Sequence, residues 1–404
     1  MNIKSFFSIY KKLFLFLLVI PVTCFSQNNY IKNPHVEINN TDDNEFYYFT
    51  YTFKDQWDIS RNFNFKFPKD YTNRKIHKFG IPETLAQPFT PSEKAINIRK
   101  EIAKDGLFRI NKNTIEIDKS AIVSFYAKDY GRPIANFIKE ILEEKGADTR
   151  LQRIEMAMKF VQDIPYGIPN WEKNGNYYGG ISTPPEILIF GYGDCDSKAF
   201  LFACILSYLI DAGDIVFVQQ DQHLLTAVKI NSVNEMSYIP INGDNYAIAE
   251  TSGPARFNFG EIEQIEKNEI IAEKLVFHKD IDRLSSQPSS NNPIKLSSKI
   301  VVQKRSFYKL FFRNDYDEEI VILMHFQDID GNWVTEGWYK IKSGETIHIA
   351  SSRNKTFYYF ARCQDGEWAG ESFREFEGKT YGFNKIKNPQ SSFADLIYVL
   401  TGNQ

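Results

Sequence analysis

The spacing of hydrophobic and polar residues predicts a mixture of strands and helices in the first part of the chain. Residues 46–67 alternate between apolar and polar positions around a polar turn, which is typical of a β-hairpin. Helical spacing follows at residues 94–104, 134–145 and 150–164. Pro133 stands at the start of the second of these segments, where a helix tolerates proline.

A different pattern occupies the middle of the chain. Residues 195–210 are apolar almost all round, and a helix without a polar face is buried on every side. Four strand-like segments follow, the last two joined by the turn "NGDN": residues 215–220, 223–230, 236–241 and 246–251. These segments predict a buried helix packed against an antiparallel sheet.

Composition divides the chain into regions. Residues 283–298 are rich in Ser, Asn and Pro and predict an exposed linker. Before the linker we expect a β-rich region at 27–93 and a central domain at 94–282. After the linker, the strand-like pattern of residues 299–384 predicts an all-β domain, which with its tail spans 299–404. The predicted fold class is therefore α+β.

The N-terminus has the pattern of a secretory signal peptide. A lysine-containing lead precedes the apolar residues 13–22, and small residues Cys24 and Ser26 precede a cleavage site after residue 26. Residues 1–26 are thus expected to be removed from an exported, periplasmic or secreted protein. Anchoring as a lipoprotein through Cys24 is an alternative that the preceding "PVT" fits poorly. No later apolar run approaches membrane length, so no integral membrane segment is expected after signal removal.

Charge and cysteine content narrow the function classes. The chain has 404 residues and a net charge of −3, which gives no case for nucleic-acid binding. No cofactor or metal site is expected. Of its four cysteines, Cys24 lies in the signal peptide, and the remaining odd number leaves at least one thiol without an intramolecular disulfide partner.

One cysteine stands where a loop becomes a helix, in "FGYGDCDSKAFLF". Cys195 follows Asp194, a helix N-cap residue type, and a helix N-terminus favours the thiolate that attacks acyl carbon. The flanking aspartates raise the thiol pKa, so a base is also needed. Cys204, by contrast, lies inside the apolar run and is interpreted as a packing residue.

A histidine and a carboxylate are suitably placed to assist this cysteine. His223 opens a strand of the predicted sheet, and Glu250 ends another. Each residue taken alone is more often structural. If the two strands are neighbours, however, both side chains can point at the start of the helix, as a base and the group that orients it require.

The order of these motifs resembles that of the bacterial transglutaminase-like cysteine peptidases. The matching segments are "FVQDIPYG", "TPPEILIFGYGDCDSKAFLFACILSYL", "QHLLTAV" and "YAIAETSGP". The resemblance implies a papain/transglutaminase-like core, with Cys195 as nucleophile, His223 as general base and Glu250 orienting the imidazole. The chain departs from many family members at Ser197, where they carry an acid, and at Glu250, where the wider superfamily often has Asp.

The oxyanion donor and the role of the C-terminal part each allow more than one interpretation. The oxyanion donor is expected to be the backbone N–H of Cys195, with a side chain of Gln162 or Trp171 as a second donor. The C-terminal part resembles a small bacterial β domain of unknown function, carried by Trp333, Thr335 and "GWY" at 337–339. Its aromatic residues either form the domain core or bind a partner or glycan.

These observations predict an exported cysteine hydrolase. It would act on amide or peptide bonds of a protein or peptide substrate, with the cell envelope as one source of such substrates, through a Cys-His-Glu triad and an acyl-enzyme. Release of the acyl group to a lysine amine instead of water would make it a cross-linking acyl transferase. The third hypothesis is a non-catalytic cell-envelope binding or scaffold protein.

Overall fold

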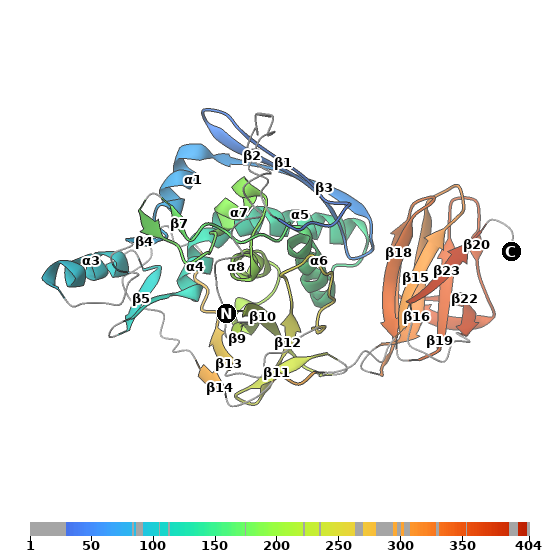
Figure 1. Ribbon diagram of the computed structural model, residues 1–404. Coiled ribbons are helices and arrows are strands. Elements are labelled where there is room, and N and C mark those ends of the chain that lie inside the picture. Colours follow the sequence, from blue (N-terminus) through green and yellow to red (C-terminus); the bar gives the residue numbers. More distant parts are fainter. Residues whose placement is uncertain are drawn as a thin grey trace, which may run out of the picture.

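The computed structural model has a mixed α+β fold (Figure 1). The predicted signal peptide, residues 283–293 and residues 297–298 of the predicted linker lie outside the part of the chain that it describes. The described residues are 30–82, 85, 92–104, 106–111, 114–173, 175–220, 223–233, 236–262, 270–279, 294–296, 300–302, 308–328, 331–352, 354–387 and 395–401.

An antiparallel sheet of three strands opens the described chain. Its strands are β1 (Glu37–Asp42), β2 (Phe46–Lys54) and β3 (Ser60–Pro68), and they contain the hairpin predicted at residues 46–67. Tyr51 and Phe53 on β2 are buried, and each ring centroid lies 5.1 Å from that of Phe160 on the third helix predicted above. The N-terminal sheet thus shares its core with the central helices.

The central helices form a layer beneath this sheet. Their bounds confirm the helices predicted at 94–104, 134–145 and 150–164, with Pro133 in the first turn of the second one. They are α1 (Lys69–Ile76), α3 (Glu93–Lys104), α4 (Lys119–Tyr126), the π-helical turn η1 (Ala127–Gly131), α5 (Arg132–Glu144), α6 (Arg150–Asp163), α7 (Pro184–Phe190) and α8 (Cys195–Leu206).

Helix α8 lies at the centre of this layer (Figure 1). Asp196 is its one residue that is not buried, as expected for a helix that is apolar almost all round. The helix ends at Leu206, and a short run of turns continues the predicted segment to residue 210. At Gly131, a side chain would collide with the carbonyl of Cys204, so glycine allows η1 to approach α8 closely.

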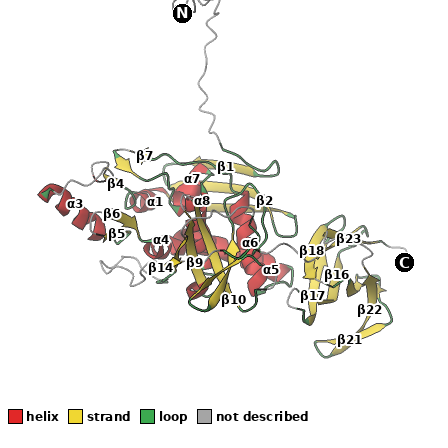
Figure 2. Ribbon diagram, turned by 60° about the horizontal axis from the view of Figure 1, so that its bottom comes forward, coloured by secondary structure: helices red, strands yellow, loops and turns green. Residues whose placement is uncertain are grey.

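A six-stranded antiparallel sheet covers the opposite side of the helices (Figure 2). The turn Asn242–Gly243 has positive φ at both residues, as a type I′ hairpin requires, and this confirms the predicted hairpin. One face carries Phe217, Leu224 and Val228 into the core shared with the helices. In order across the sheet, the strands are β11 (Tyr238–Ile241), β12 (Asp244–Ala249), β10 (His223–Ile230), β9 (Ile215–Gln220), β13 (Ile270–Lys274) and β14 (Ile294–Leu296).

The predicted linker requires a correction. Residues 294–296 form β14, which pairs with β13 at the edge of the sheet, although this segment was expected to be an exposed tether. Val301 also bridges Tyr238 through two backbone hydrogen bonds. Ile300 is buried in the same unit. Apolar residues within a polar segment thus added an edge strand, because β13 had an open side for pairing.

The described C-terminal part is all-β, as predicted, and its strands form a sandwich of two sheets. One sheet has the order β18-β15-β23 and the other β17-β16-β19-β22-β21, with β20 beside β19. The tail expected after residue 384 contributes β23, which pairs in parallel with β15. The strands are β15 (Tyr308–Asn314), β16 (Ile320–Gln327), β17 (Trp333–Ile341), β18 (Thr346–Ser352), β19 (Thr356–Arg362), β20 (Glu367–Trp368), β21 (Ser372–Phe376), β22 (Lys379–Lys387) and β23 (Asp395–Leu400).

The sandwich docks against the end of α5. Lys145 is buried there, donates to the carbonyl of Lys340 at 3.0 Å and forms an ion pair with Glu345 at 3.3 Å. Short elements complete the fold: β4 (Ile81–Pro82), β5 (Phe108–Asn111), β6 (Thr114–Ile117), β7 (Glu172–Lys173), β8 (Asn176–Tyr177) and the 3-10 turn η2 (Ala212–Asp214).

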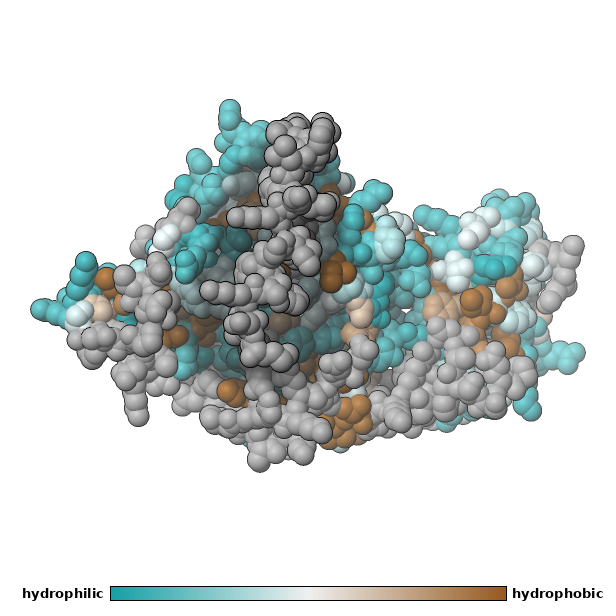
Figure 3. Space-filling model, in the orientation of Figure 1, coloured by the Kyte–Doolittle hydropathy of each residue, from teal (hydrophilic) through white to brown (hydrophobic). Residues whose placement is uncertain are grey.

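Where Figure 3 is coloured, the surface is mostly hydrophilic, with hydrophobic side chains exposed in small groups. Within the described ranges, no helix combines the length and the apolar character needed to cross a membrane.

Candidate active site

Cys195 is the first residue of α8, directly after the N-cap Asp194. The Asp194 carboxylate accepts hydrogen bonds from the backbone N–H of Ser197 at 3.0 Å and from its hydroxyl at 2.5 Å. The Ser197 oxygen in turn accepts from the backbone N–H of Ser182 at 2.8 Å, which ties the helix start to the chain entering α7. The thiol therefore sits at a capped helix N-terminus, where the helix dipole favours negative charge.

His223 and Glu250 meet at one end of the antiparallel pair β10 and β12. Thr226 is opposite Ala249, so the start of β10 and the residue after β12 lie together. The Nε2 of His223 is 2.9 Å from Oε2 of Glu250. The imidazole is also hydrogen-bonded to the Cys195 side chain, and since Nε2 is bound to Glu250, Nδ1 is left for the thiol. All three predicted triad residues are thus brought together.

Glu250 is held in place from several directions. Its Oε1 accepts from the backbone N–H of Ser252 at 2.8 Å and from the Ser252 hydroxyl at 2.5 Å. Its backbone carbonyl accepts from Nε2 of Gln162 at 2.7 Å. The carboxylate is buried, whereas about a third of the His223 side chain, 31%, is exposed. Glu250 is therefore a fixed partner behind an imidazole that solvent reaches.

The electrostatics of the three groups are coupled. Burial alone would lower the pKa of His223, but hydrogen bonds to Cys195 and Glu250 outweigh it and raise the pKa to about 10. Burial would raise the pKa of Glu250, yet the bond to His223 and the bonds to Ser252 lower it. Burial raises the pKa of the Cys195 thiol, and the His223 bond opposes this rise. The arrangement thus favours an imidazolium between a carboxylate and the sulfur.

Of the two aspartates beside the cysteine, Asp196 acts against the thiolate as predicted. Cys195 Sγ lies 3.4 Å from Oδ1 of Asp196, and that carboxylate raises the thiol pKa. Burial raises the pKa of Asp194 to about 6 and also raises the pKa of Asp196. The helix N-terminus alone therefore does not supply a reactive thiolate, and His223 is needed.

The two side chains predicted as oxyanion donors differ in their surroundings. Both amide hydrogens of Gln162 are used, because Nε2 donates to the carbonyls of Glu250 and Phe257 at 2.7 and 2.9 Å. Its prediction as a donor is therefore wrong, and Gln162 instead positions the segment that follows β12. Trp171 is 57% exposed and its ring centroid lies 5.9 Å from that of Tyr177, and its role as an oxyanion donor stays a prediction.

Lys198 is a functional residue that sequence reasoning missed. It is fully buried one turn after Cys195, and its Nζ donates to the carbonyls of Ser252 at 2.6 Å and Gln162 at 3.3 Å. Burial lowers its pKa to about 7. A lysine inside an otherwise apolar helix was the available signal. Lys198 fastens the Glu250–Ser252 segment to the helix that carries the nucleophile.

Tyr166 also lies at the site without having been singled out. It pairs with Gly193 on one side and with Ile31 on the other. Burial, followed by the charges of Cys195 and the nearby carboxylates, raises its pKa to about 12. Its phenol therefore stays protonated and can donate a hydrogen bond. The sequence feature that could have indicated Tyr166 is its position near the end of the segment "FVQDIPYG".

None of the three described cysteines forms a disulfide, and Cys204 is fully buried as the packing interpretation requires. Across the described ranges, no group of three or more His, Cys, Asp or Glu side chains is arranged to hold a metal ion. Comparison with known proteins found no matching family model, no matching curated protein and no matching solved structure.

Proposed function

We propose that the chain is a cysteine hydrolase of transglutaminase-like type that acts on amide or peptide bonds. The observation that supports this most is the unbroken chain of hydrogen bonds from the Cys195 thiol through His223 to Glu250, at the N-terminus of a buried helix. The helix packed against the antiparallel sheet agrees with a papain/transglutaminase-like core, which is part of the proposal.

The first half of the proposed reaction forms an acyl-enzyme. His223 Nδ1 takes the proton of the Cys195 thiol, and the sulfur attacks the carbonyl carbon of the amide. The C=O π electrons move to the oxygen, which becomes the tetrahedral oxyanion. When the oxyanion collapses, the C–N bond breaks, and the imidazolium returns its proton to the leaving amine. Glu250 stabilises the imidazolium and does not itself take the proton.

The second half releases the acyl group. A water gives a proton to His223 while its oxygen attacks the thioester, and collapse of the second oxyanion expels the Cys195 sulfur, which recovers the proton. Attack by a lysine amine in place of water would give cross-linking, which remains the alternative outcome. The backbone N–H of Cys195 and the Tyr166 hydroxyl are the proposed oxyanion donors.

The setting of the reaction follows from the N-terminal sequence. Residues 1–26 predict export, so the proposed substrates are proteins or peptides of the periplasm, cell envelope or exterior. A non-catalytic scaffold is the second candidate. The intact triad argues against it, because a scaffold has no need of a buried carboxylate oriented on a histidine beside a thiol.

The proposal is tested by incubating a cell-envelope protein extract with the mature protein in water enriched in ¹⁸O. Hydrolysis predicts new carboxyl groups that carry ¹⁸O, and addition of dansylcadaverine distinguishes transamidation by incorporation of the fluorophore. Cys195→Ala is the matched control, and it should produce neither product. Equal background for wild type and the variant in both arms would favour the scaffold.

A further inference from the structure

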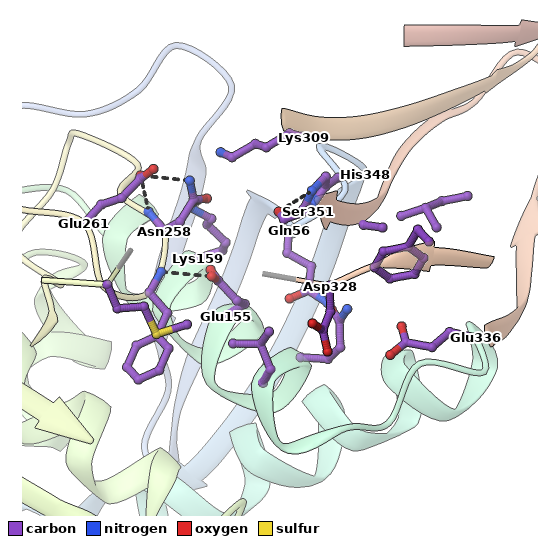
Figure 4. A pocket seen from close by; sticks show the side chains of 17 residues that line it. Gln56, Glu155, Lys159, Asn258, Glu261, Lys309, Asp328, Glu336, His348 and Ser351 are labelled. Carbon is purple, nitrogen blue, oxygen red and sulfur yellow. Dashed lines mark hydrogen bonds between the residues drawn. The ribbon is translucent and has the colours of Figure 1, made fainter. Parts of the chain in front are cut away.

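A cavity of about 150 Å³ lies between the central unit and the C-terminal sandwich (Figure 4). A cavity of this volume can hold a molecule of about the size of benzene. Glu155 and Lys159, both on α6, and Asn258 line one side, and Asp328 and Glu336 line the side formed by the sandwich. The cavity is separate from the proposed triad, and the inference does not depend on the proposed function.

Two buried acceptors face this cavity without a donor. Glu155 Oε1 accepts from the backbone N–H of Phe259 at 2.9 Å, but its Oε2 is buried and has no hydrogen-bond partner within the described part of the chain. The same holds for Oε1 of Gln56, whose amide nitrogen donates to Gln152. Buried acceptors are normally paired, so both atoms call for hydrogen-bond donors inside the cavity.

The side chains that line the cavity carry a net negative charge, which attracts a cation. Four carboxylates, Glu155, Glu261, Asp328 and Glu336, face two lysines. One of these, Lys159, is already engaged, since its Nζ donates to the carbonyls of Phe257 at 2.6 Å and Arg256 at 3.3 Å. The lining therefore has an excess of two negative charges that a cationic donor would offset.

Part of the wall is apolar. Met236 and Phe259 contribute from the central unit, and Phe326 and Ile349 contribute from the sandwich. Such side chains suit the short hydrocarbon chain of a ligand, whereas the carboxylates suit a charged group at the end of that chain. Burial raises the pKa of Glu155 and of Glu336, which is the desolvation that an approaching cation would relieve.

We propose that this cavity binds a small alkylammonium ion, with the ammonium group donating to Glu155 Oε2 and Gln56 Oε1 and the alkyl chain against the apolar wall. Because both units line the cavity, the bound amine bridges them and favours their docked arrangement. A ligand that binds only the folded protein stabilises it, and the stabilisation rises with the logarithm of the free ligand concentration above Kd.

Calorimetric titration of the mature protein with propylammonium tests the site, with 1-propanol as a neutral probe of similar shape and butyrate as an anionic one. We expect saturable binding and a higher Tm with propylammonium alone. Glu155→Gln should weaken binding by about tenfold or more, because a charge-assisted hydrogen bond is lost. Glu143→Gln, at an exposed position on α5, should bind as wild type does.

Glu336→Gln, on the opposite wall, provides a second variant if Glu155→Gln fails to fold, and it should also weaken binding of propylammonium. The proposal is overturned if 1-propanol stabilises the protein as much as propylammonium does, or if both variants retain wild-type affinity. Absence of saturable binding would mean that the cavity holds water only, which also overturns it.

Discussion

At the scale of single residues, the environment of Cys195 contains opposing influences. The helix N-terminus and the His223 hydrogen bond favour the thiolate, whereas burial and Asp196 favour the thiol. His223 shifts this balance by carrying a proton, and Glu250 makes that charged form favourable. Reactivity in this account is a property of the three groups together.

Glu250→Gln should lower the pKa of His223 below its value of about 10, because the carboxylate charge that holds the imidazolium is removed. NMR titration of the His223 ring measures this directly. The raised pKa of His223 also contributes to the free energy of unfolding. This contribution is complete below pH 6.5, the pKa of histidine in the unfolded chain, and is lost as pH rises toward 10. The fall in unfolding free energy over this range should therefore be smaller in the variant, and an equal fall would contradict the assignment.

At the scale of elements, the start of α8 combines a structural and a chemical role. Asp194 caps the helix through Ser197, yet it is largely buried and its pKa is about 6. An acid whose pKa is higher in the folded state than in the unfolded chain favours folding when protonated. The capping carboxylate therefore costs stability once it ionises.

Asp194→Asn should retain the cap, because an amide oxygen also accepts from the N–H of Ser197. The contribution of Asp194 to wild-type stability should decline as pH rises from 3.8 to about 6, and the variant should lack this decline. Above pH 6 the variant should be more stable by on the order of 1 kcal/mol. Urea unfolding at pH 4, 5 and 7 measures the difference, and a variant that is less stable at every pH would show that the charge itself is needed for capping.

Much of this element-scale arrangement could be predicted because its signals are local. The buried helix, the strands at 215–220 and 223–230 and the "NGDN" turn each follow from periodicity or turn chemistry within a few residues. The edge strand Ile294–Leu296 could not, because three residues in a polar segment carry too little pattern, and their pairing depends on an open strand elsewhere.

The direction in which side chains point was the second feature that could not be predicted from the sequence. The sequence alone did not show that the Gln162 amide donates to two carbonyls, since Glu250 and Phe257 are distant along the chain. The same reason hid the role of Lys198, whose acceptors lie on two other segments. The tail strand Asp395–Leu400 pairs with β15, more than 80 residues earlier in the sequence, and no local pattern indicates such a partner.

At the scale of the whole molecule, the central unit and the sandwich meet through a buried ion pair. The side chains of Lys145 and Glu345 are only 3% and 13% exposed. Lys342 and Glu144 form a second pair between the same two units, but their side chains are 66% and 49% exposed. The contrast offers a buried pair and an exposed control at one interface.

Lys145→Ala should destabilise the protein by about 3 kcal/mol, because it leaves Glu345 buried without its partner. Lys342→Ala should cost no more than about 1 kcal/mol, since solvent screens the exposed pair. Urea unfolding of both variants and of the Lys145→Ala/Glu345→Ala double variant measures the coupling within the buried pair. Equal costs for the two lysines would mean that the sandwich does not dock through Lys145.

The central claim, that Cys195 is a nucleophile activated by His223, is tested most directly by its alkylation rate. Purified mature protein and His223→Ala are treated with iodoacetamide at pH 8, and mass spectrometry follows Cys195, Cys204 and Cys363 separately. We predict that Cys195, although 8% exposed, reacts faster than the more exposed Cys363 in wild type. In His223→Ala, compared at a temperature at which both proteins are folded, its rate should fall by about tenfold or more. A Cys195 that reacts more slowly than Cys363 in wild type, at a rate unchanged in His223→Ala, would contradict the account.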